Sequence, residues 1–167
     1  MKYKCVYQSP IGNMIMLGEG NKLYGIWFED KDHFDEQQLC AAATSETQPA
    51  FKAARAWLDE YFEGKQPGEL KAELAPRGSE FRRTVWEILL EIPYGKSLTY
   101  GEIAKLLEKK LGRKMSARAV GGAVGHNPIS IIIPCHRVLG KEGRITGYAG
   151  GIDRKIALLK LENIEWN

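Results

Sequence analysis

The stretch Asn127-Pro128-Ile129-Ser130-Ile131-Ile132-Ile133-Pro134-Cys135-His136-Arg137-Val138 joins an apolar run directly to a cysteine–histidine pair. A short, continuous apolar run is typical of a strand buried on both faces, so residues 129–133 are expected to form one. Pro134 would end that strand, because proline has no N–H to donate to a sheet. Cys135 is therefore expected at the mouth of the core, held rigidly rather than carried on a mobile loop.

The side chains next to Cys135 suit a reactive thiol. A cysteine reacts as its thiolate, which needs a neighbouring base or a cationic environment to form. His136 is adjacent, Arg137 adds positive potential, and Glu162 could orient the imidazole. A cysteine beside a histidine is also consistent with a buried structural thiol, and the pair by itself leaves that alternative open.

The composition is that of a globular chain. The 167 residues are 44% hydrophobic and 27% charged, and no apolar run approaches the length needed to span a bilayer. The first residues lack the apolar stretch of a signal peptide, so we expect a cytoplasmic protein. The three cysteines are odd in number and widely spaced, which argues against a disulfide framework.

The charges are distributed unequally between the two halves of the chain. Residues 1–75 carry 8 Lys/Arg and 12 Asp/Glu, a net of −4, whereas residues 76–167 carry 16 and 9, a net of +7. A basic half beside an acidic half suggests that the second half faces a polyanion. Chance segregation of solvated surface charges is the alternative.

The first third of the chain has the pattern of an antiparallel meander. Residues 2–8, 14–18 and 23–29 favour strands and are separated by turn sequences. An acidic loop follows, and residues 49–62 have a helical period. Residues 66–78 contain two prolines and two glycines, and we place there the boundary between an N-terminal α/β domain, 1–75, and a second domain, 76–167.

The second domain is predicted to be mostly helical. Ser79 can cap a helix that runs to about residue 91. Thr99 and Glu102 have the form of a capping box for a helix over residues 100–111, with Gly112 as its stop.

A second short helix completes a motif with the helix over residues 100–111. Ser116 can open a helix over residues 117–125, which is rich in small residues. A helix, a turn and a small-residue helix suggest a helix-turn-helix, and an amphipathic helix follows over residues 153–162. The expected fold class is therefore α/β (α+β), with a small antiparallel sheet and helix followed by a mostly helical part.

Several segments of the second domain resemble one known family, the O6-alkylguanine-DNA alkyltransferases. Residues 127–138 are similar to its active-site signature, residues 116–123 to its recognition helix, and residues 147–151 to its substrate-pocket loop. Glu162 falls at the spacing of the family's acid. The similarity covers about residues 81–162, whereas residues 1–75 match in size and order of elements only.

This resemblance implies both a fold and an activity. The first domain would be ribonuclease-H-like, and the second would bind DNA and carry the active site. The function implied is direct repair of DNA, in which the alkyl group on O6 of a guanine is transferred irreversibly to Cys135, once per molecule.

The resemblance assigns the DNA contacts to the helix over residues 117–125. Arg118 would fill the gap left in the base stack when the damaged nucleotide is turned out, with a phosphate contact or a solvated charge as the alternative. Asn127 would tie this helix to the active-site segment, and the basic stretch 105–114 would add phosphate contacts. The small residues that would let the helix backbone approach the minor groove are Ala117, Ala119, Gly121 and Gly122.

The resemblance also implies a reaction without a metal or an organic cofactor. Glu162 would act through His136 and a water to take the proton of Cys135. Tyr100 would donate a proton toward guanine N3, and a stable thioether would remain. The residues implied to form the substrate pocket are Pro134, Val138, Tyr148 and Ala149. The implied partner is double-stranded DNA containing O6-alkylguanine, bound by a monomer that has no membrane association.

This sequence departs from some relatives near the implied pocket. Ala149 stands where some relatives have a hydroxyl residue, and Ser130 where some have a proline. The loop between Leu106 and Arg118 is a few residues longer than in many relatives.

The remaining thiols, Cys5 and Cys40, are expected to be packing residues. Some relatives bind a structural zinc in this part of the chain, for which His33 would be a third ligand. The spacing of these residues has no finger-like pairs, so no metal site is predicted.

Three other functions are compatible with parts of the pattern. A non-catalytic binder of alkylated DNA would not need Cys135. A cysteine hydrolase would use Cys135 with His136 but would give the Arg118 helix no role. A DNA-binding regulator would need only the helix-turn-helix.

Overall fold

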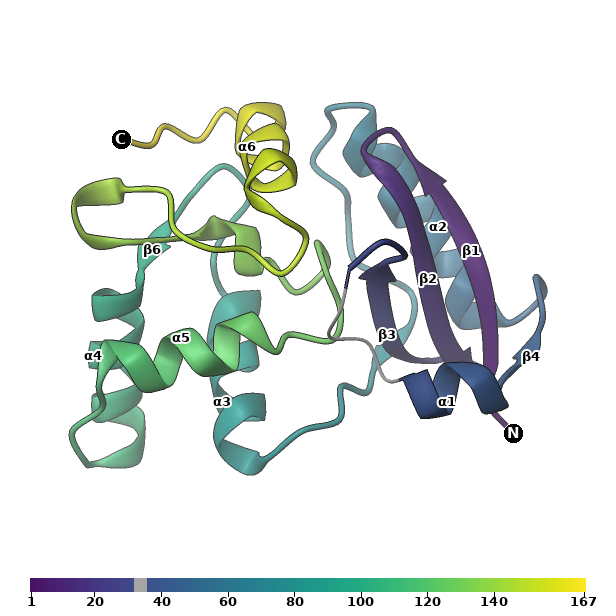
Figure 1. The fold of residues 1–167 in the computed structure, drawn as a ribbon, viewed down its shortest axis with the longest axis horizontal. Helices are drawn as coiled ribbons and strands as arrows, with labels where there is room; N and C mark the ends of the chain where they lie inside the picture. The colour runs from purple at the N-terminus through teal and green to yellow at the C-terminus, as the bar shows by residue number, and fades with distance from the viewer. Residues whose placement is uncertain (32–35) are drawn as a thin grey trace. The chain divides into compact units, whose positions relative to one another are not determined.

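The computed structural model describes residues 1–31 and 36–167, which divide into two units, Met1–Arg77 and Gly78–Asn167. The first unit is built on the strands β1 (Tyr3–Ser9), β2 (Gly12–Glu19) and β3 (Lys22–Phe28), which pair antiparallel in succession (Figure 1). The predicted meander is confirmed, with strand ends that differ by one or two residues.

The sheet of the first unit is extended at both edges. Its order among the described residues is β4-β1-β2-β3-β5, with β4 (Ala43–Thr44) and β5 (Glu73–Leu74) paired parallel to their neighbours. Helix α2 (Pro49–Phe62), predicted with the same bounds, packs against the three central strands. Its buried stripe is Ala50, Phe51, Ala54, Leu58 and Tyr61.

Two segments predicted to be loops carry regular structure. The segment predicted as an acidic loop contains α1 (Glu36–Ala41) and β4, and the boundary segment 66–78 contains β5. Two-residue strands are too short to show a periodicity in the sequence. Helix α1 has one buried residue, Leu39, which packs with Leu17 and Trp27, so it too has no apolar period. His33, the third residue considered for zinc, lies outside the described residues.

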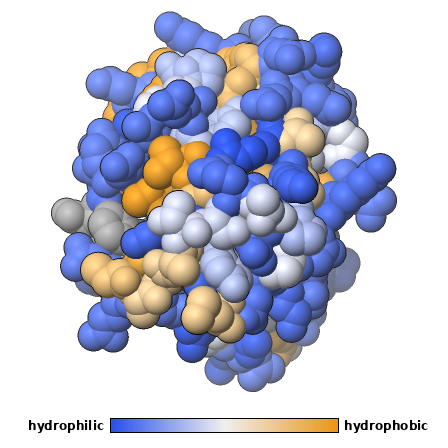
Figure 2. Space-filling model, turned by 90° about the vertical axis from the view of Figure 1, so that its right-hand side faces the viewer, coloured by the Kyte–Doolittle hydropathy of each residue, from blue (hydrophilic) through white to orange (hydrophobic). Residues whose placement is uncertain are grey.

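Figure 2 shows the face of this unit seen from the right-hand side of Figure 1, where β1 and β4 lie. The face is mostly hydrophilic, and its apolar side chains form several small, separate groups. Small apolar groups of this kind are ordinary on a protein surface.

The second unit consists mainly of helices, as predicted. Its major helices are α3 (Glu80–Leu90), α4 (Tyr100–Leu111), α5 (Ala117–Gly125) and α6 (Ile152–Leu161). Shorter elements are β6 (Leu98–Thr99), the 3-10 helices η1 (Cys135–Arg137) and η2 (Lys141–Gly143), and β7 (Val138–Leu139). None of the described helices combines the length and apolar character needed to cross a membrane.

The predicted helix starts form as expected. The Ser79 hydroxyl accepts from the backbone N–H of Arg82, and the Ser116 hydroxyl from that of Ala119. Thr99 and Glu102 make both bonds of the capping box. Gly112 ends α4 in the left-handed conformation, which glycine adopts without steric cost.

Helix α5 contacts both α3 and α4 (Figure 1). The Trp86 side chain is 2% exposed, and its Nε1–H donates to the carbonyl of Ala123 at 2.9 Å. This buried bond fixes α5 on α3 and thereby sets the position of the residues at the start of α5.

The prediction of a strand over residues 129–133 is wrong. Ile131 has φ 69°, and the backbone bonds are local, from Ile132 N to Ser130 O and from Ile133 N to Ile129 O. The segment is a tightly folded turn whose isoleucines are nevertheless buried. The run is apolar because residues 129–133 are all buried. Burial alone does not distinguish a strand from a compact turn.

The parallel pairing of β6 with β7 brings two distant segments together. Leu98 pairs with Val138 and Thr99 with Leu139. Tyr100 begins α4 immediately after β6, and Cys135–Arg137 immediately precedes β7. The fold therefore places the start of the helix-turn-helix beside the cysteine turn.

The bond from Trp86 to Ala123 yields a stability prediction. Trp86→Phe removes the donor and some buried volume, and should lower the free energy of unfolding by about 1–3 kcal/mol. Urea titration followed by far-UV circular dichroism measures this change. Leu90→Ala, at an exposed position of the same helix, is the control and should change the value by less than about 0.5 kcal/mol. Coincident curves for Trp86→Phe and the wild type would contradict the assigned role.

Candidate active site

Cys135 lies at the first position of η1, buried at 5% exposure. Its backbone N–H donates to Ile133 O at 2.8 Å. The Asn127 side chain holds the preceding turn at two points, donating from Nδ2 to Ile133 O at 2.8 Å and accepting at Oδ1 from Ile129 N at 3.0 Å. Because Asn127 directly follows α5, its amide links that helix to the cysteine turn.

His136 and Arg137 share one buried carboxylate, that of Glu162. His136 Nε2 lies 2.5 Å from Glu162 Oε2, and Arg137 Nε donates to Glu162 Oε1 at 2.8 Å. The same Oε1 accepts from the backbone N–H of Gly95 at 3.0 Å. His136 is 0% exposed and Glu162 2%, so these charged and polar groups are shielded from solvent. The predicted pairing of His136 with Glu162 is therefore present.

The carboxylate fixes the tautomer of His136. A carboxylate only accepts, so the proton between the two groups belongs to His136 Nε2 and the ring's basic lone pair is on Nδ1. Burial lowers the pKa of His136, although Glu162 raises it. The imidazole is therefore neutral near pH 7 and able to accept a proton.

The resting thiol is also neutral. Burial raises the pKa of Cys135, while the Asn127 side chain and the positive charge of Lys155 lower it. Ionisation of Cys135 thus depends on a base, and the neighbouring neutral imidazole is suited to that role.

Lys155 is a residue of this site that the sequence interpretation missed. It is 0% exposed, and its Nζ donates to Val138 O at 2.6 Å and to Gly147 O at 3.3 Å. Burial lowers its pKa to about 8, opposed by Cys135. The signal in the sequence was its position: Lys155 lies on the same helical stripe as the buried Leu158 and Leu159.

Two tyrosines lie within electrostatic range of Cys135. Burial raises the pKa of both Tyr100 and Tyr148, and the Cys135 thiolate adds to the rise in each. The Tyr148 hydroxyl is buried without a hydrogen-bond partner among the described residues. The Tyr100 hydroxyl accepts from Thr146 Oγ1 at 3.2 Å.

The remaining residues predicted for the pocket lie on the segments around Cys135. Pro134 is buried, and Ala149 is half-buried in the loop before α6. The Val138 carbonyl already accepts from Lys155, and the Cys135 carbonyl from Val138 N. A carbonyl oxygen has two lone pairs, so each can still accept from a substrate.

A pocket of about 550 Å³ opens between the start of α4, the start of α5 and the loop before α6. Arg118 lines it with an exposed side chain. A Cβ added to Gly121 would lie 3.8 Å from the Tyr100 ring, and one added to Gly122 would meet nothing within 4 Å. The other residues lining this pocket are Thr99, Tyr100, Gly101, Ala117, Lys141, Thr146 and Gly147.

Exposed small and basic residues lie on α4, on α5 and on the loop between them. Ala117, Ala119 and Gly122 are exposed, as are the basic residues of α4 and the loop that follows it, Lys105, Lys109, Lys110, Arg113 and Lys114. This surface combines positive charge with an open helix backbone, a combination suited to a nucleic-acid backbone.

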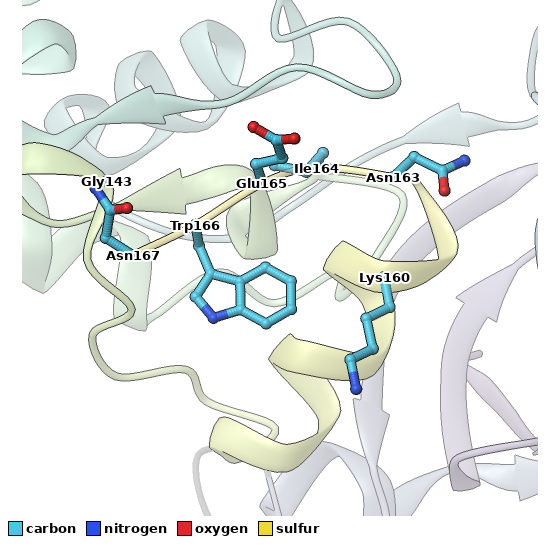
Figure 3. A pocket seen from close by; sticks show the side chains of 7 residues that line it. All are labelled: Gly143, Lys160, Asn163, Ile164, Glu165, Trp166 and Asn167. Atoms are coloured by element: carbon cyan, nitrogen blue, oxygen red, sulfur yellow. The ribbon is translucent and has the colours of Figure 1, made fainter.

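Two other pockets carry none of the predicted site residues. One of about 700 Å³ is lined by Lys160, Trp166 and the segment around them, and contains no cysteine or histidine (Figure 3). Another, of about 390 Å³ in the first unit, contains Cys5 and Cys40. Burial raises the pKa of Cys5 to about 11, and the described residues that line the pocket include no histidine. Within the described ranges, no group of His, Cys, Asp and Glu could hold a metal ion.

Comparison with known proteins gives matches over nearly the whole chain. The family model described as "6-O-methylguanine DNA methyltransferase, DNA binding domain" matches residues 80–164, and the one described as its "ribonuclease-like domain" matches residues 2–76. A methylated-DNA–protein-cysteine methyltransferase of Methanosarcina acetivorans is 43% identical over 96% of this chain and 97% of its own. One from Haemophilus influenzae is 38% identical over 98% and 88%.

Solved structures agree with the fold. The crystal structure of an O6-methylguanine methyltransferase from Mycobacterium tuberculosis superposes with a TM-score of 0.82 at 41% identity, covering 97% of this chain and 93% of its own. A second structure from that organism, in complex with DNA, gives 0.81 at 41% identity, covering 96% and 92%. These similarities confirm the predicted fold class and the family resemblance. The chain belongs to the 6-O-methylguanine DNA methyltransferase family.

Proposed function

We propose that this protein repairs DNA directly, by transferring the alkyl group from O6 of a damaged guanine to Cys135, irreversibly and once per chain. The observation that carries the proposal is that the buried Cys135 is followed in η1 by the neutral His136, whose ring is held by Glu162. The names of the relatives, methylated-DNA–protein-cysteine methyltransferases, support the same reaction.

The reaction begins with proton removal from Cys135. His136 accepts the proton at Nδ1, through a water, and Glu162 stabilises the imidazolium that forms, as in other Cys–His pairs. The Lys155 ammonium supports the developing thiolate, since its charge lowers the pKa of Cys135. The sulfur then attacks the alkyl carbon in line, forming a C–S bond as the C–O6 bond breaks with its electron pair on oxygen.

The leaving guanine carries the electron pair of the broken bond and needs a proton. Tyr100 donates one toward N3, while carbonyls of Cys135 and Val138 accept from the exocyclic amine. The N–H of Ala149 donates toward O6, and Tyr148 walls the pocket with Pro134. A thioether has no easy hydrolysis route, so Cys135 is not regenerated.

The damaged base must leave the duplex to reach a buried thiol. Extrusion costs about a few kcal/mol, and Arg118 compensates by filling the gap in the stack. The small residues Ala117, Ala119, Gly121 and Gly122 let α5 lie close to the minor groove. Asn127 joins α5 to the cysteine turn, so that docking of the helix and presentation of the thiol are coupled.

We assign residues 1–75 to an N-terminal α/β domain and residues 76–167 to the domain that binds DNA and reacts. The protein is proposed to act as a monomer in the cytoplasm. Its three free cysteines fit a reducing compartment.

Reaction with a methylated duplex tests the proposal. Incubation with a duplex containing one O6-methylguanine should increase the intact mass by one CH2 group, located on Cys135 by peptide mapping, and should repair one lesion per chain. Cys135→Ala should abolish the gain, whereas Cys40→Ser, at an exposed thiol, should retain it. Multiple turnover would indicate a hydrolase-like enzyme, and active binding without a mass gain would indicate a binder or regulator.

Comparison of duplex with free base tests the role of Arg118. Arg118→Ala should reduce the rate of repair of duplex by about 10- to 100-fold, because nothing fills the gap in the stack. Its rate with free O6-methylguanine should change by less than about twofold, since no extrusion is needed. Arg113→Ala is the control: it should weaken binding of all duplexes and reduce the salt dependence, but it should not slow repair at saturating duplex or reaction with the free base. Equal losses on both substrates for Arg118→Ala would refute the role.

The pH dependence of transfer tests the neutral His136. Because burial lowers its pKa below 6.5, more than half of the base is unprotonated at pH 6.5, and the rate should reach half of its maximum only at a lower pH. Glu162 raises that pKa, so Glu162→Gln should move the acid limb to still lower pH and reduce the maximal rate. Stopped-flow measurement on duplex checks both effects, with the exposed Glu165→Gln as control. A wild-type rate already halved at pH 6.5 would contradict the lowered pKa of His136.

A further inference from the structure

We propose that Thr146 is a positioning residue for the transfer reaction, because its hydroxyl donates to the Tyr100 oxygen and leaves the Tyr100 proton directed toward the substrate. This inference rests on the proposed function and extends it to a residue of the loop after η2. Both side chains line the pocket that also contains Arg118.

The contact joins two elements that are distant in sequence. Thr146 Oγ1 donates to the Tyr100 hydroxyl at 3.2 Å across 46 residues. Hydrogen bonds between hydroxyl groups are usually 2.5–3.0 Å long, so this one is longer than usual. Catalytic hydrogen bonds are often long in the absence of substrate and shorten in the reacting complex.

The direction of donation decides what Tyr100 can do. A phenol has one proton to donate, and its oxygen can accept at the same time. When Thr146 occupies the oxygen as a donor, the Tyr100 proton must point elsewhere, and the remaining direction is the pocket. The bond also lowers the pKa of Tyr100 against the effect of burial, which makes Tyr100 a better acid.

The loop is built to hold Thr146 in this place. Gly140 N donates to Arg144 O at 2.7 Å, which closes the turn before Thr146. A Cβ on Gly140 would lie 2.6 Å from Thr146 Cγ2, so the glycine provides the space for the Thr146 methyl group. On the other side, Lys155 Nζ holds the Gly147 carbonyl. Thr146 is thus anchored through both neighbouring segments.

The branched side chain of Thr146 further restricts where its hydroxyl can lie. Threonine is restricted at χ1, so the position of its methyl group fixes that of its hydroxyl. With the methyl against Gly140, the hydroxyl faces Tyr100. Substitution by serine keeps the donor but frees the rotamer, and substitution by valine keeps the shape but removes the donor.

The test is a double-mutant cycle on the rate of transfer from bound duplex. Thr146→Val should slow transfer by about three- to tenfold, the effect of losing one ordinary hydrogen bond, and Thr146→Ser should retain at least half of the wild-type rate. In the Tyr100→Phe background, Thr146→Val should have no further effect, because the group it orients is gone. Duplex affinity and the urea midpoint should stay unchanged in Thr146→Val, which separates positioning from a merely structural role.

Several results would overturn the inference. Equal slowing by Thr146→Val in both backgrounds would show that Thr146 acts without Tyr100, and equal slowing by Ser and Val would exclude a role for the hydroxyl. If the wild type gains an alkyl group on Cys135 and Thr146→Val matches its rate, the positioning role alone fails. If the wild type gains no alkyl group, the proposed function fails and the inference with it.

Discussion

The rest of the site depends on the hydrogen bonds that the buried carboxylate of Glu162 accepts. It lies at the end of α6 and binds the His136 ring, the Arg137 guanidinium and the backbone of Gly95. Arg137 also donates to the carbonyl of Ile92 at 2.8 Å, so the group joins α6, η1 and the turn after α3. A buried carboxylate is tolerable only when its acceptor sites are occupied, and loss of one partner of such a pair costs about 3–5 kcal/mol. The same bonds that orient the base therefore hold the helices around it.

The second constraint is β7, a strand of only two residues. It follows the cysteine turn directly, pairs with the strand that precedes Tyr100, and its Val138 carbonyl is held by Lys155. Cys135, Tyr100 and the loop before α6 are thus all positioned by one short piece of backbone. A reaction that depends on alignment of several groups gains from such common anchoring, because small displacements reduce the rate steeply.

The sequence predicted the regular helices well and the irregular backbone poorly. Capping residues such as Ser79, Thr99 and Ser116 act locally, so their effect can be recognised without tertiary structure. The 129–133 turn could not be recognised, because its shape depends on the Asn127 side chain and on burial from several sides. Lys155 was missed for a related reason. Its role depends on the carbonyls of Val138 and Gly147, which only the tertiary structure brings to its Nζ. Glu162 was a candidate partner for His136 by residue type, and the family resemblance then supported its position, since 26 residues separate the two and no spacing rule connects them.

The electrostatic state of the site suits an acceptor that can react only once. Among the three thiols, Cys40 is exposed, whereas Cys5 and Cys135 are buried, and His136 directly follows Cys135 in the chain. Thiolates are the form that oxidants and adventitious electrophiles attack, and a neutral buried thiol resists them. A catalyst that turns over has processed many substrate molecules before its nucleophile is lost. A stoichiometric acceptor whose thiol is oxidised beforehand never reacts at all. A buried thiol that stays neutral at rest therefore suits an acceptor that is used once.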